Sequence, residues 1–383
     1  MAERQPSKLH VASSNLVSRS TSPSAEGAGP TDPPGPSAGD RRAAIAAQSL
    51  LLRRSLERTI RAEPALSARA ADLSAAYRSG VEPIEGFNHG HVHDPASAEA
   101  YAAARMPATF AAVARAMGAA ADRLPGFHPT SLLDAGAGTG AASWAATAVW
   151  PSLVELTLVD REAAGIALGR RLAAAAAGPG RLAGAHWTVG HVNAELPRQS
   201  DLVVAAYLLG ELPASEMDGA VARLWAATTG VLVLVEPGSR AGFERIRQAR
   251  AALIEAGGTV AAPCPGNDLC PIETPAWCHF LARLDRSPLQ RRAKTAQRSW
   301  EDEPFSYVAV GRPPLPAAPL PRVVLGRPRQ RKGMVELRVC LDGRIEERTL
   351  SRRDGPAWRA ARDLEWGDPV PHEVLEAGRR GGP

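Results

Sequence analysis

The chain has 383 residues, 45% of them hydrophobic, and a formal net charge of +5. That length and apolar content allow two or three domains with cores of their own. No run approaches the roughly eighteen uninterrupted apolar residues of a membrane span, so the composition excludes a membrane-spanning helix and we expect a soluble protein.

Residues 1–40 are rich in Ser, Pro and Gly and hold few large apolar side chains. A segment of this kind cannot bury enough surface to offset the entropy lost on ordering, so we predict a disordered tail. Its acidic residues Glu3, Glu26 and Asp32 and the lack of an apolar signal core argue against a targeting peptide. We therefore expect the protein to stay in the cytoplasm, a reducing compartment.

A helical N-terminal region is predicted for residues 41–125, where Ala, Leu and Arg recur at helical spacing. Three histidines, His89, His91 and His93, lie between its helical stretches. Alternate positions on an extended strand project to one side, which would suit a metal site. Exposed loop histidines are the commoner outcome for such a polar segment, and we favour that interpretation.

A glycine-rich turn follows the next apolar stretch. Residues 131–135 are predicted to form a short buried strand, and Ala141 to Val149 a helix. The glycines between them let the backbone come close to a ligand, and the helix N-terminus offers unpaired N–H groups. A second apolar strand, at 154–159, ends in Asp160, which is placed to accept hydrogen bonds from ribose hydroxyls. The turn and this acidic residue together predict a nucleotide-binding site.

The turn resembles the first motif of class I S-adenosylmethionine methyltransferases rather than the dinucleotide-binding motif. In that family the leading acidic residue lies near the methionine moiety and the glycines line the nucleoside. The resemblance implies that S-adenosylmethionine is bound here by Asp134, Gly136, Gly138 and Gly140. Asp160 joins this set from the second strand. The loop after the third strand lacks the acidic residue that is often found near the adenine. It has Asn193 instead, which completes the set of predicted cofactor-binding residues.

Three further strands are predicted at 186–189, 201–206 and 231–235, separated by helical stretches. This alternation predicts a doubly wound, Rossmann-like core over residues 126–257. The segment 207–213, where methyltransferases of this class face their acceptor, has no Asp/Asn-Pro-Pro-aromatic motif and no cysteine nucleophile. Cofactor binding is therefore better supported than catalysis, and a Rossmann-like domain without a ligand remains an alternative.

The chain has four cysteines, three of them in one Pro-rich stretch: Cys264, Cys270, Cys278 and Cys340. In a reducing compartment, cysteine is usually kept for metals or catalysis. Four thiolates complete the ligand shell of an all-cysteine zinc site or of a cubane iron-sulfur cluster. The intervening segments of five, seven and sixty-one residues are longer than the roughly two to four residues of zinc modules, which favours the cluster. Zinc and four ordinary buried thiols remain the alternatives.

Positive charge is concentrated between residues 279 and 362. This stretch has 19 Lys and Arg against 9 Asp and Glu, a balance of +10, so the rest of the +5 chain sums to −5. Such asymmetry is typical of a nucleic-acid-binding face, and Arg suits RNA because its guanidinium pairs with phosphates and stacks on bases. A solvated basic surface is the alternative. The predicted RNA-binding residues are Arg291, Arg292, Lys294, Arg327, Arg329, Arg331 and Lys332.

The same stretch predicts strands over residues 322–339 and a hairpin turn at Asp342-Gly343. We interpret residues 258–367 as a cysteine-cluster and basic β region, followed by a tail at 368–383. A cluster closed by Cys340 would tie this β unit to the loop that carries the other three thiolates.

The cysteine pattern occurs together with three further signatures in a fixed order: Trp277 to Phe280, Arg286 to Leu289 and Trp366 to Asp368. Together they resemble the mitochondrial ribosomal small-subunit methyltransferase-like family, which also has bacterial members, over roughly residues 45–367. The resemblance implies that the four cysteines hold a [4Fe-4S] cluster. It also implies a role in assembly of the small ribosomal subunit, with that subunit and its rRNA as partners.

The expected fold is α/β: a class I S-adenosylmethionine methyltransferase core with N-terminal helices and a C-terminal cluster-binding loop plus a small β unit. We expect a monomeric, cytoplasmic, bacterial assembly factor of the small ribosomal subunit that binds S-adenosylmethionine, a [4Fe-4S] cluster and rRNA. Two other functions remain open. One is an active S-adenosylmethionine-dependent rRNA methyltransferase, and the other is a zinc-stabilised RNA-binding module with a vacant methyltransferase fold.

Overall fold

The computed structural model describes most of the chain beyond residue 34. The described residues are 35–79, 92, 94–176, 181–194, 196–314, 322–341 and 343–377. His89, His91 and His93, and nearly all of the predicted tail at 1–40, lie outside the described residues. By their contacts, residues Gly35–Pro383 group into one unit.

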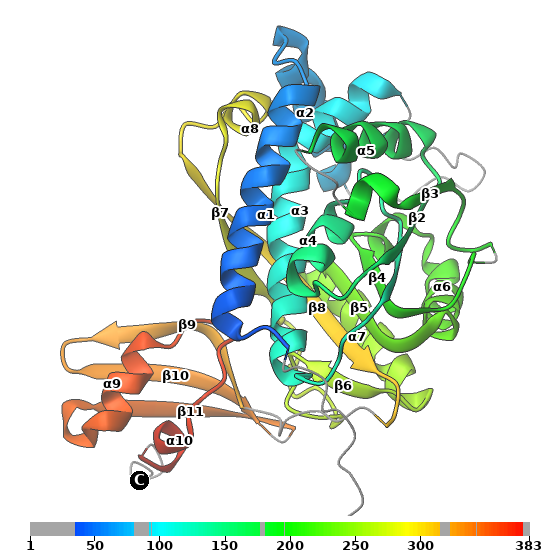
Figure 1. The fold of residues 1–383 in the computed structure, drawn as a ribbon. Coiled ribbons are helices and arrows are strands. Elements are labelled where there is room, and N and C mark those ends of the chain that lie inside the picture. The colour runs from blue at the N-terminus through cyan, green and yellow to red at the C-terminus, as the bar shows by residue number, and fades with distance from the viewer. Residues whose placement is uncertain are drawn as a thin grey trace, which may run out of the picture. The chain divides into compact units, whose positions relative to one another are not determined.

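Three helices precede the first strand: α1 (Ala38–Thr59), α2 (Pro64–Ser79) and α3 (Pro95–Arg123). Helix α1 begins inside the predicted tail because Ser37 and Asp40 form a capping box, each side chain accepting from the backbone N–H of the other. Alanines occupy most buried positions of α3, so neighbouring elements approach its backbone closely. Figure 1 shows α1 running beside α3, with which it is in contact.

The main sheet has eight strands: β1 (Ser131–Ala135), β2 (Glu155–Asp160), β3 (His186–Val189), β4 (Ser200–Ala206), β5 (Thr228–Pro237), β6 (Thr259–Ala262), β7 (Phe280–Asp285) and β8 (Trp300–Gly311). Their order is β3-β2-β1-β4-β5-β8-β6, and β7 pairs with β8 off this path. The first five strands in this order are parallel, whereas β8 is antiparallel to all three of its partners. The chain order reverses between β1 and β4, the point at which doubly wound sheets bind ligands.

Helices cover both faces of the main sheet. The helices that lie between its strands in chain order are α4 (Ala141–Val149), α5 (Ala163–Ala175), η1 (Arg181–Gly184), η2 (Leu209–Glu211), α6 (Ala214–Ala226), α7 (Arg240–Glu255) and α8 (Pro288–Ala293). Because neighbouring strand residues point to opposite faces, Leu132 and Leu133 of β1 belong to different cores. Leu132 packs with α1, α3, α4 and α5, and Leu133 packs with α6 and α7. These layers confirm the predicted α/β fold class. No helix among the described residues is both long and apolar enough to cross a membrane.

The Rossmann-like core extends beyond its predicted end at residue 257. Strand β8 inserts between β5 and β6, and its apolar run pairs Val308 with Leu234 and Val310 with Leu232. A fully buried strand of this kind has no alternating pattern to mark its position in the sheet. The cysteine-bearing segment 263–279 is therefore a connection between two strands of the main sheet, β6 and β7.

A second, antiparallel sheet follows, in the order β11-β10-β9: β9 (Val323–Arg331), β10 (Met334–Leu341) and β11 (Arg344–Ser351). Leu341 pairs with Arg344, and Gly343 has a φ of +70°, so β10 and β11 form the predicted hairpin. The expected small β unit is therefore present (Figure 1).

This β unit has an apolar core of its own. Val335, Val339 and Leu350 pack with two helices that follow η3 (Arg352–Asp354), namely α9 (Pro356–Asp363) and α10 (His372–Ala377). The structure differs here from the predicted tail at 368–383, because Val374 and Leu375 of α10 are buried in that core. A six-residue helix is too short to show helical periodicity in the sequence.

Candidate functional site

The glycine-rich turn after β1 forms one wall of a cavity, which we call the glycine-loop cavity. Gly136 and Gly138 have φ values of +71° and +53°, in the left-handed region that favours glycine. The backbone N–H groups of Gly136 and Ala137 donate to the Val159 carbonyl at 2.8 and 3.0 Å, which fixes the turn to β2. A Cβ on Gly136 would lie 2.8 Å from Leu208, whereas one on Gly138 would meet nothing within 4 Å. The turn therefore leaves open space beside Gly138.

Asp160 lines the same cavity from the end of β2. Its carboxylate accepts from the backbone N–H groups of Gly138 at 2.7 Å and Glu162 at 2.8 Å. Burial nevertheless raises its pKa above the ordinary value. Each carboxylate oxygen keeps a lone pair, so Asp160 can accept further hydrogen bonds from a ligand. The cavity volume is about 70 Å³, and the cavity is open to solvent.

Three of the six predicted cofactor residues lie beside this cavity rather than on its surface. Asp134 lies under the turn, where its carboxylate accepts from the N–H and hydroxyl of Ser143 at 3.0 and 2.7 Å. Burial raises the pKa of Asp134 to about 7. Gly140 is the N-cap of α4, with a φ of +87°. The side chain of Asn193 bonds Glu216 and Arg223, and its neighbours His191 and Val192 line the cavity instead.

Tyr207 was missed as a site residue, although it directly follows the fourth predicted strand. It has a φ of +59°, which is a strained conformation for a tyrosine and is concentrated at functional sites. Its hydroxyl donates to Glu303 at 3.0 Å, and Glu303 is held by Arg105 at 2.7 Å. Burial raises the pKa of Tyr207 well above its ordinary value, so the phenol stays protonated near neutral pH.

Tyr207, Tyr101 and Glu211 also form part of the wall of a second cavity, of about 690 Å³. This second cavity continues toward Arg245 and Lys294. The two cavities thus meet at the end of β4, on the side where the sequence predicted an acceptor.

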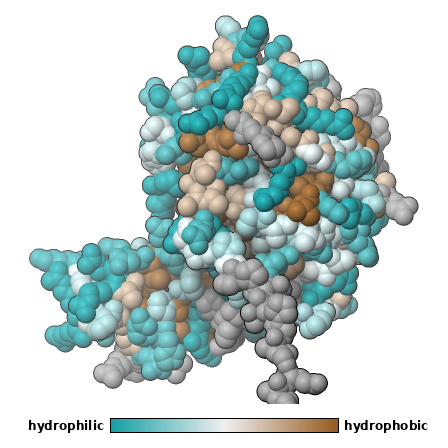
Figure 2. Space-filling model, viewed as in Figure 1, coloured by the Kyte–Doolittle hydropathy of each residue, from teal (hydrophilic) through white to brown (hydrophobic). Residues whose placement is uncertain are grey.

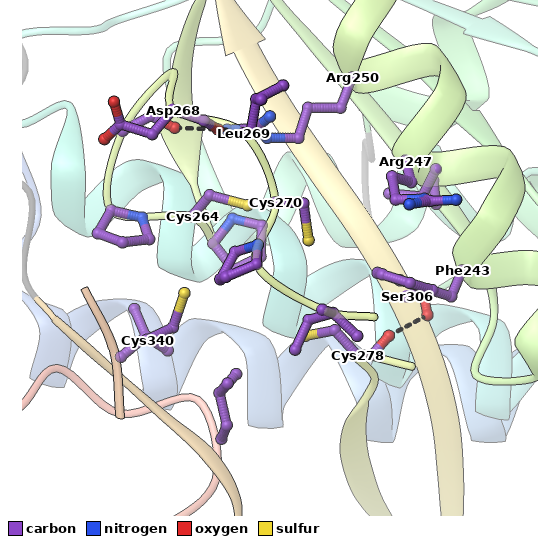
Figure 3. A pocket seen from close by; sticks show the side chains of 18 of the residues that line it. Phe243, Arg247, Arg250, Cys264, Asp268, Leu269, Cys270, Cys278, Ser306 and Cys340 are labelled. Atoms are coloured by element: carbon purple, nitrogen blue, oxygen red, sulfur yellow. Dashed lines mark hydrogen bonds between the residues drawn. The ribbon is translucent and has the colours of Figure 1, made fainter. Parts of the chain in front are cut away.

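The four cysteines come together around one space, which we call the cysteine cavity (Figure 3). They reach it from one connection and one strand: Cys264, Cys270 and Cys278 from the segment between β6 and β7, and Cys340 from β10. All four are half-buried thiols, and the cavity volume is about 60 Å³. The structure thus brings together residues that are up to 76 positions apart in the sequence.

The acidity of the Cys278 thiol reflects its burial and its neighbours. Burial, followed by the charges of the other three cysteines, raises the pKa of Cys278 well above its ordinary value. A nearby positive charge, such as that of bound metal, would offset this rise and favour the thiolate. The donor set therefore fits a four-thiolate metal centre. The described residues contain no group of three or more His, Cys, Asp or Glu side chains arranged to hold a single ion.

Hydrogen bonds fasten the cysteine-bearing segment to the main sheet. The Asn267 side chain accepts from the Val260 N–H at 2.9 Å and donates to the Gly258 carbonyl at 3.1 Å. The Ser306 hydroxyl donates to the Cys278 carbonyl at 2.8 Å, and the Trp277 indole donates to the Gly238 carbonyl at 3.0 Å. Three of the thiols are thus held by the core independently of any ligand.

The predicted RNA-binding residues fall into two groups: Arg291, Arg292 and Lys294 in or just after α8, and Arg327, Arg329, Arg331 and Lys332 on or just after β9. Lys294 pairs with Glu301 and Arg327 pairs with Asp302 at 3.2 Å. Neighbouring residues of β8 point to opposite faces, so Lys294 and Arg327 contact opposite faces of this strand. The β9 group is exposed, and the visible surface of the C-terminal β unit is mainly hydrophilic (Figure 2).

Comparison with known proteins adds to this geometry. A model of the family described as mitochondrial small ribosomal subunit Rsm22 matches residues 95–371. The mitochondrial ribosome assembly protein METTL17 of Homo sapiens is 35% identical over 294 residues, which are 71% of this chain and 62% of that protein. The mitochondrial Rsm22-cox11 tandem protein 2 of Schizosaccharomyces pombe is 27% identical over 221 residues, covering 45% of this chain and 29% of the relative. The chain thus spans less than two thirds of the length of these relatives.

Among solved structures, magnesium protoporphyrin IX methyltransferase from Synechocystis, with bound S-adenosylmethionine, aligns with a TM-score of 0.36 and 13% identity. The alignment covers 63% of this chain and 97% of that protein.

Proposed function

Because the chain belongs to the mitochondrial small ribosomal subunit Rsm22 family, we propose that it is an assembly factor of the small ribosomal subunit. The observation that carries the proposal is the extent of the family match. It runs from residue 95 to 371 and includes the glycine loop, all four cysteines and β9. The name of the human relative, a ribosome assembly protein, supports the same role. We further propose that the protein acts as a monomer in the cytoplasm of a bacterium.

We propose that the glycine-loop cavity binds S-adenosylmethionine. Asp160 would accept hydrogen bonds from the ribose hydroxyls, and the space beside Gly138 would take the nucleoside. Asp134 would act indirectly, by holding the N-terminus of α4 in place through Ser143. The cofactor supplies an activated methyl group when bound. Tyr207, protonated and fixed to Glu303, is a neutral polar group between this cavity and the next.

We propose that Cys264, Cys270, Cys278 and Cys340 hold a [4Fe-4S] cluster. The support is the gathering of four thiols around one space. When bound, a cubane cluster supplies four iron atoms that each take one thiolate. Its role here would be structural, because it would join β10 of the C-terminal unit to the segment fastened on the main sheet.

We propose that the C-terminal unit contacts rRNA through the exposed arginines of β9. Arg329 and Arg331 project from the strand into solvent, where guanidinium groups can reach phosphates. Arg327 and Arg331 form ion pairs with Asp302 and Glu336, at 3.2 and 3.3 Å. Exposed pairs of this kind are weak, so phosphates can compete for the arginines.

The experiment that tests the assembly role is sedimentation of cell extracts from a strain that lacks the protein. We expect small-subunit particles to accumulate as lighter precursors, and the purified protein to co-sediment with those precursors. A Cys278→Ser variant should fail to restore mature particles, whereas an Arg247→Lys variant, changed at an exposed position of α7, should restore them. A normal particle profile in the strain without the protein would contradict the assembly role.

A second candidate function is methyl transfer to rRNA. The observation that favours it is the second cavity, which opens at Tyr207 next to the glycine-loop cavity. Incubating isolated precursor particles with radiolabelled S-adenosylmethionine tests it. Label in rRNA with the parent protein and none with a Gly138→Phe variant would establish an enzyme. Absence of label, with cofactor bound, would leave the assembly role alone.

The third interpretation is a zinc-stabilised RNA-binding module with a vacant methyltransferase fold. Purification without oxygen, followed by an absorption spectrum and metal analysis, decides between the two metals. A brown protein with about four irons per chain supports the cluster. A colourless protein with stoichiometric zinc supports the zinc module, provided that S-adenosylmethionine also gives no heat of binding.

A further inference from the structure

We propose that Arg250 is the buried counter-charge of the cysteine cavity, a positioning residue that holds the cysteine-bearing segment and donates a hydrogen bond to the anionic metal centre. The inference rests on the proposed four-cysteine site and deepens it, because it names a residue that sets the reduction potential of that site. Arg250 lies on α7, outside the cysteine motif, and reaches the cavity from the main sheet's helical layer (Figure 3).

The first observation is the position of the Arg250 side chain. Only 7% of the residue is exposed, and it lines the same cavity as the four cysteines. Its Nη2 donates to the carbonyls of Gly266 and Asp268, both at 2.7 Å. These two carbonyls lie between Cys264 and Cys270, so the guanidinium shapes the segment that presents two of the thiols. Arginine can do this because its planar fork offers several donors in a fixed geometry.

The second observation is an unused donor. The Nε–H of Arg250 is buried and has no hydrogen-bond partner. No carboxylate among the described residues forms an ion pair with Arg250, which instead bonds two neutral carbonyls and lies within hydrogen-bond reach of the Cys264 side chain. A buried guanidinium without a counter-charge is costly, and an unsatisfied buried N–H adds to that cost. The cavity is therefore arranged to receive an anion.

The third observation identifies where the anion lies. Arg250 and all four cysteines line one cavity, and the two carbonyls that Arg250 holds belong to the segment between Cys264 and Cys270. Four thiolates around iron or zinc form a centre with a net negative charge, which matches the charge and the free donor of Arg250.

These observations predict an electrochemical effect. Reduction adds an electron to a centre that is already anionic, so a nearby cation and a hydrogen bond to sulfur stabilise the reduced state more than the oxidised state. Hydrogen bonds to sulfur are among the protein's main means of tuning cluster potentials. Loss of Arg250 should therefore shift the reduction potential to more negative values. Partners outside the ligand shell also affect metal retention, typically by about 10- to 100-fold in affinity.

The chain offers a matched control. Arg247 lies on the same helix and lines the same cavity, but it is exposed and pairs with Glu244 at 2.6 Å. The test compares Arg250→Met, Arg250→Lys and Arg247→Met with the parent, all purified without oxygen. Iron per chain is measured first, and the reduction potential is then measured by a spectroscopically monitored redox titration.

We expect Arg247→Met to keep the iron content and the potential of the parent. Arg250→Met should lose iron faster to a chelator, by about 10- to 100-fold, and show a more negative potential in the loaded fraction. Arg250→Lys keeps the charge but not the fork, so its potential should lie between those of the parent and Arg250→Met. If Arg250→Met retains no cluster, a more negative potential in Arg250→Lys supports the proposal.

Two outcomes overturn the proposal. One is an unchanged potential in both Arg250 variants, and the other is an equal shift in Arg247→Met. The iron content of the parent separates this failure from failure of the proposed cluster. A parent that contains zinc and no iron refutes the cluster. Zinc release to a chelator then becomes the readout, with faster release from Arg250→Met than from Arg247→Met expected, and equal release overturning the proposal.

Discussion

The glycine-loop cavity and the cysteine cavity differ in how far along the chain their residues lie. The first is built around one strand, one turn and the end of the next strand, so its central residues fall between Gly136 and Asp160. The second combines Arg250, the segment between β6 and β7, and Cys340 of a separate sheet. A site made from local backbone is present whenever its sheet is folded. A site that spans two sheets also depends on how these are joined.

The attachment of the C-terminal unit illustrates the difference. That unit has its own core, so it does not need the cysteine cavity in order to fold. Its links to the rest of the protein include the hydrogen bond from Arg115 of α3 to the Trp366 carbonyl at 2.6 Å and the exposed pair of Arg327 with Asp302 of β8. Metal bound at Cys340 would add a much stronger link. We therefore expect metal to control attachment of this unit rather than its internal fold.

The largest expected effect is on metal content. Replacing Cys278 by Ser removes one of four ligands from a buried site, so most of the iron, about four atoms per chain, should be lost. Binding of S-adenosylmethionine should persist, because the glycine-loop cavity shares no lining residue with the cysteine cavity. Iron analysis and calorimetry measure the two properties. Asp160→Ala is the control and should keep its iron.

Limited proteolysis extends this test. The metal-free protein should be cleaved faster beyond Gly257 than the loaded protein, while the segment before it stays protected. Equal resistance of both forms would show that the metal is not a structural link.

Blocking the glycine-loop cavity should have the next largest effect. A side chain at Gly138 would project into open space, so Gly138→Phe should fill the nucleoside position and abolish the heat of S-adenosylmethionine binding. Gly138→Ala is the matched control, because it has the same strain at a φ of +53° with little bulk. Iron content should be unchanged in both variants. If Gly138→Phe binds the cofactor as the parent does, the cofactor does not occupy this cavity.

The arginines of β9 should affect RNA binding alone. Replacing Arg327, Arg329 and Arg331 together should lower the log-log salt slope of binding to small-subunit particles by roughly two to three units, because fewer counterions are released. A charge-matched control replaces Arg338, Arg344 and Arg359, which are exposed elsewhere on the same unit. Co-sedimentation at several salt concentrations gives the slopes. The same slope for both triple variants would mean that the β9 arginines have no specific role.

A smaller effect is expected from Asp160. Asp160→Ala removes the acceptor for the ribose hydroxyls and should weaken S-adenosylmethionine binding by about 1 to 3 kcal/mol. It also frees the Gly138 N–H, so Asp160→Asn, which keeps one acceptor oxygen, serves as the comparison. The Asn variant should lose less affinity than the Ala variant. Parent-like affinity in Asp160→Ala would remove Asp160 from the site.

The smallest expected effect is a pH dependence at Asp134. Its folded pKa of about 7 exceeds the ordinary value of 3.8, so the folded state binds more protons between these values and stability falls as pH rises through this window. Asp134→Asn removes this dependence. The stability of the variant relative to the parent should therefore rise from pH 4 to pH 7, as measured by denaturant unfolding.

Asp201 provides a control of opposite sign, because hydrogen bonds from Thr130 and Ser131 outweigh burial and lower its pKa. Asp201→Asn should lose stability relative to the parent above the ordinary pKa of the carboxyl, and the loss should shrink as pH falls. The same trend in both variants would show that the pH dependence does not come from Asp134.

The local elements could be predicted from the sequence. The strand at 131–135, the glycine turn and the helix from Ala141 to Val149 match the structure. Their signals lie within a few residues of one another: a short apolar run, glycines that accept positive φ, and a helix that begins after the last glycine. The cysteines could be named as one set because the chain has only four. That they surround one space is a property of the fold.

Tertiary packing decided the rest. Asn193 could not be placed from its position after the third strand, because Glu216 and Arg223 of α6 determine where its side chain points. Arg250 carried no signal in the sequence. The chain has forty-two arginines, and an arginine on an amphipathic helix is expected to be exposed to solvent. It is buried because α7 packs against β8, and β8 takes its place between β5 and β6, two strands that end more than thirty residues before it begins. The sequence by itself therefore determined which residues carry the chemistry near each turn, whereas long-range strand pairing decided which of them face a common cavity.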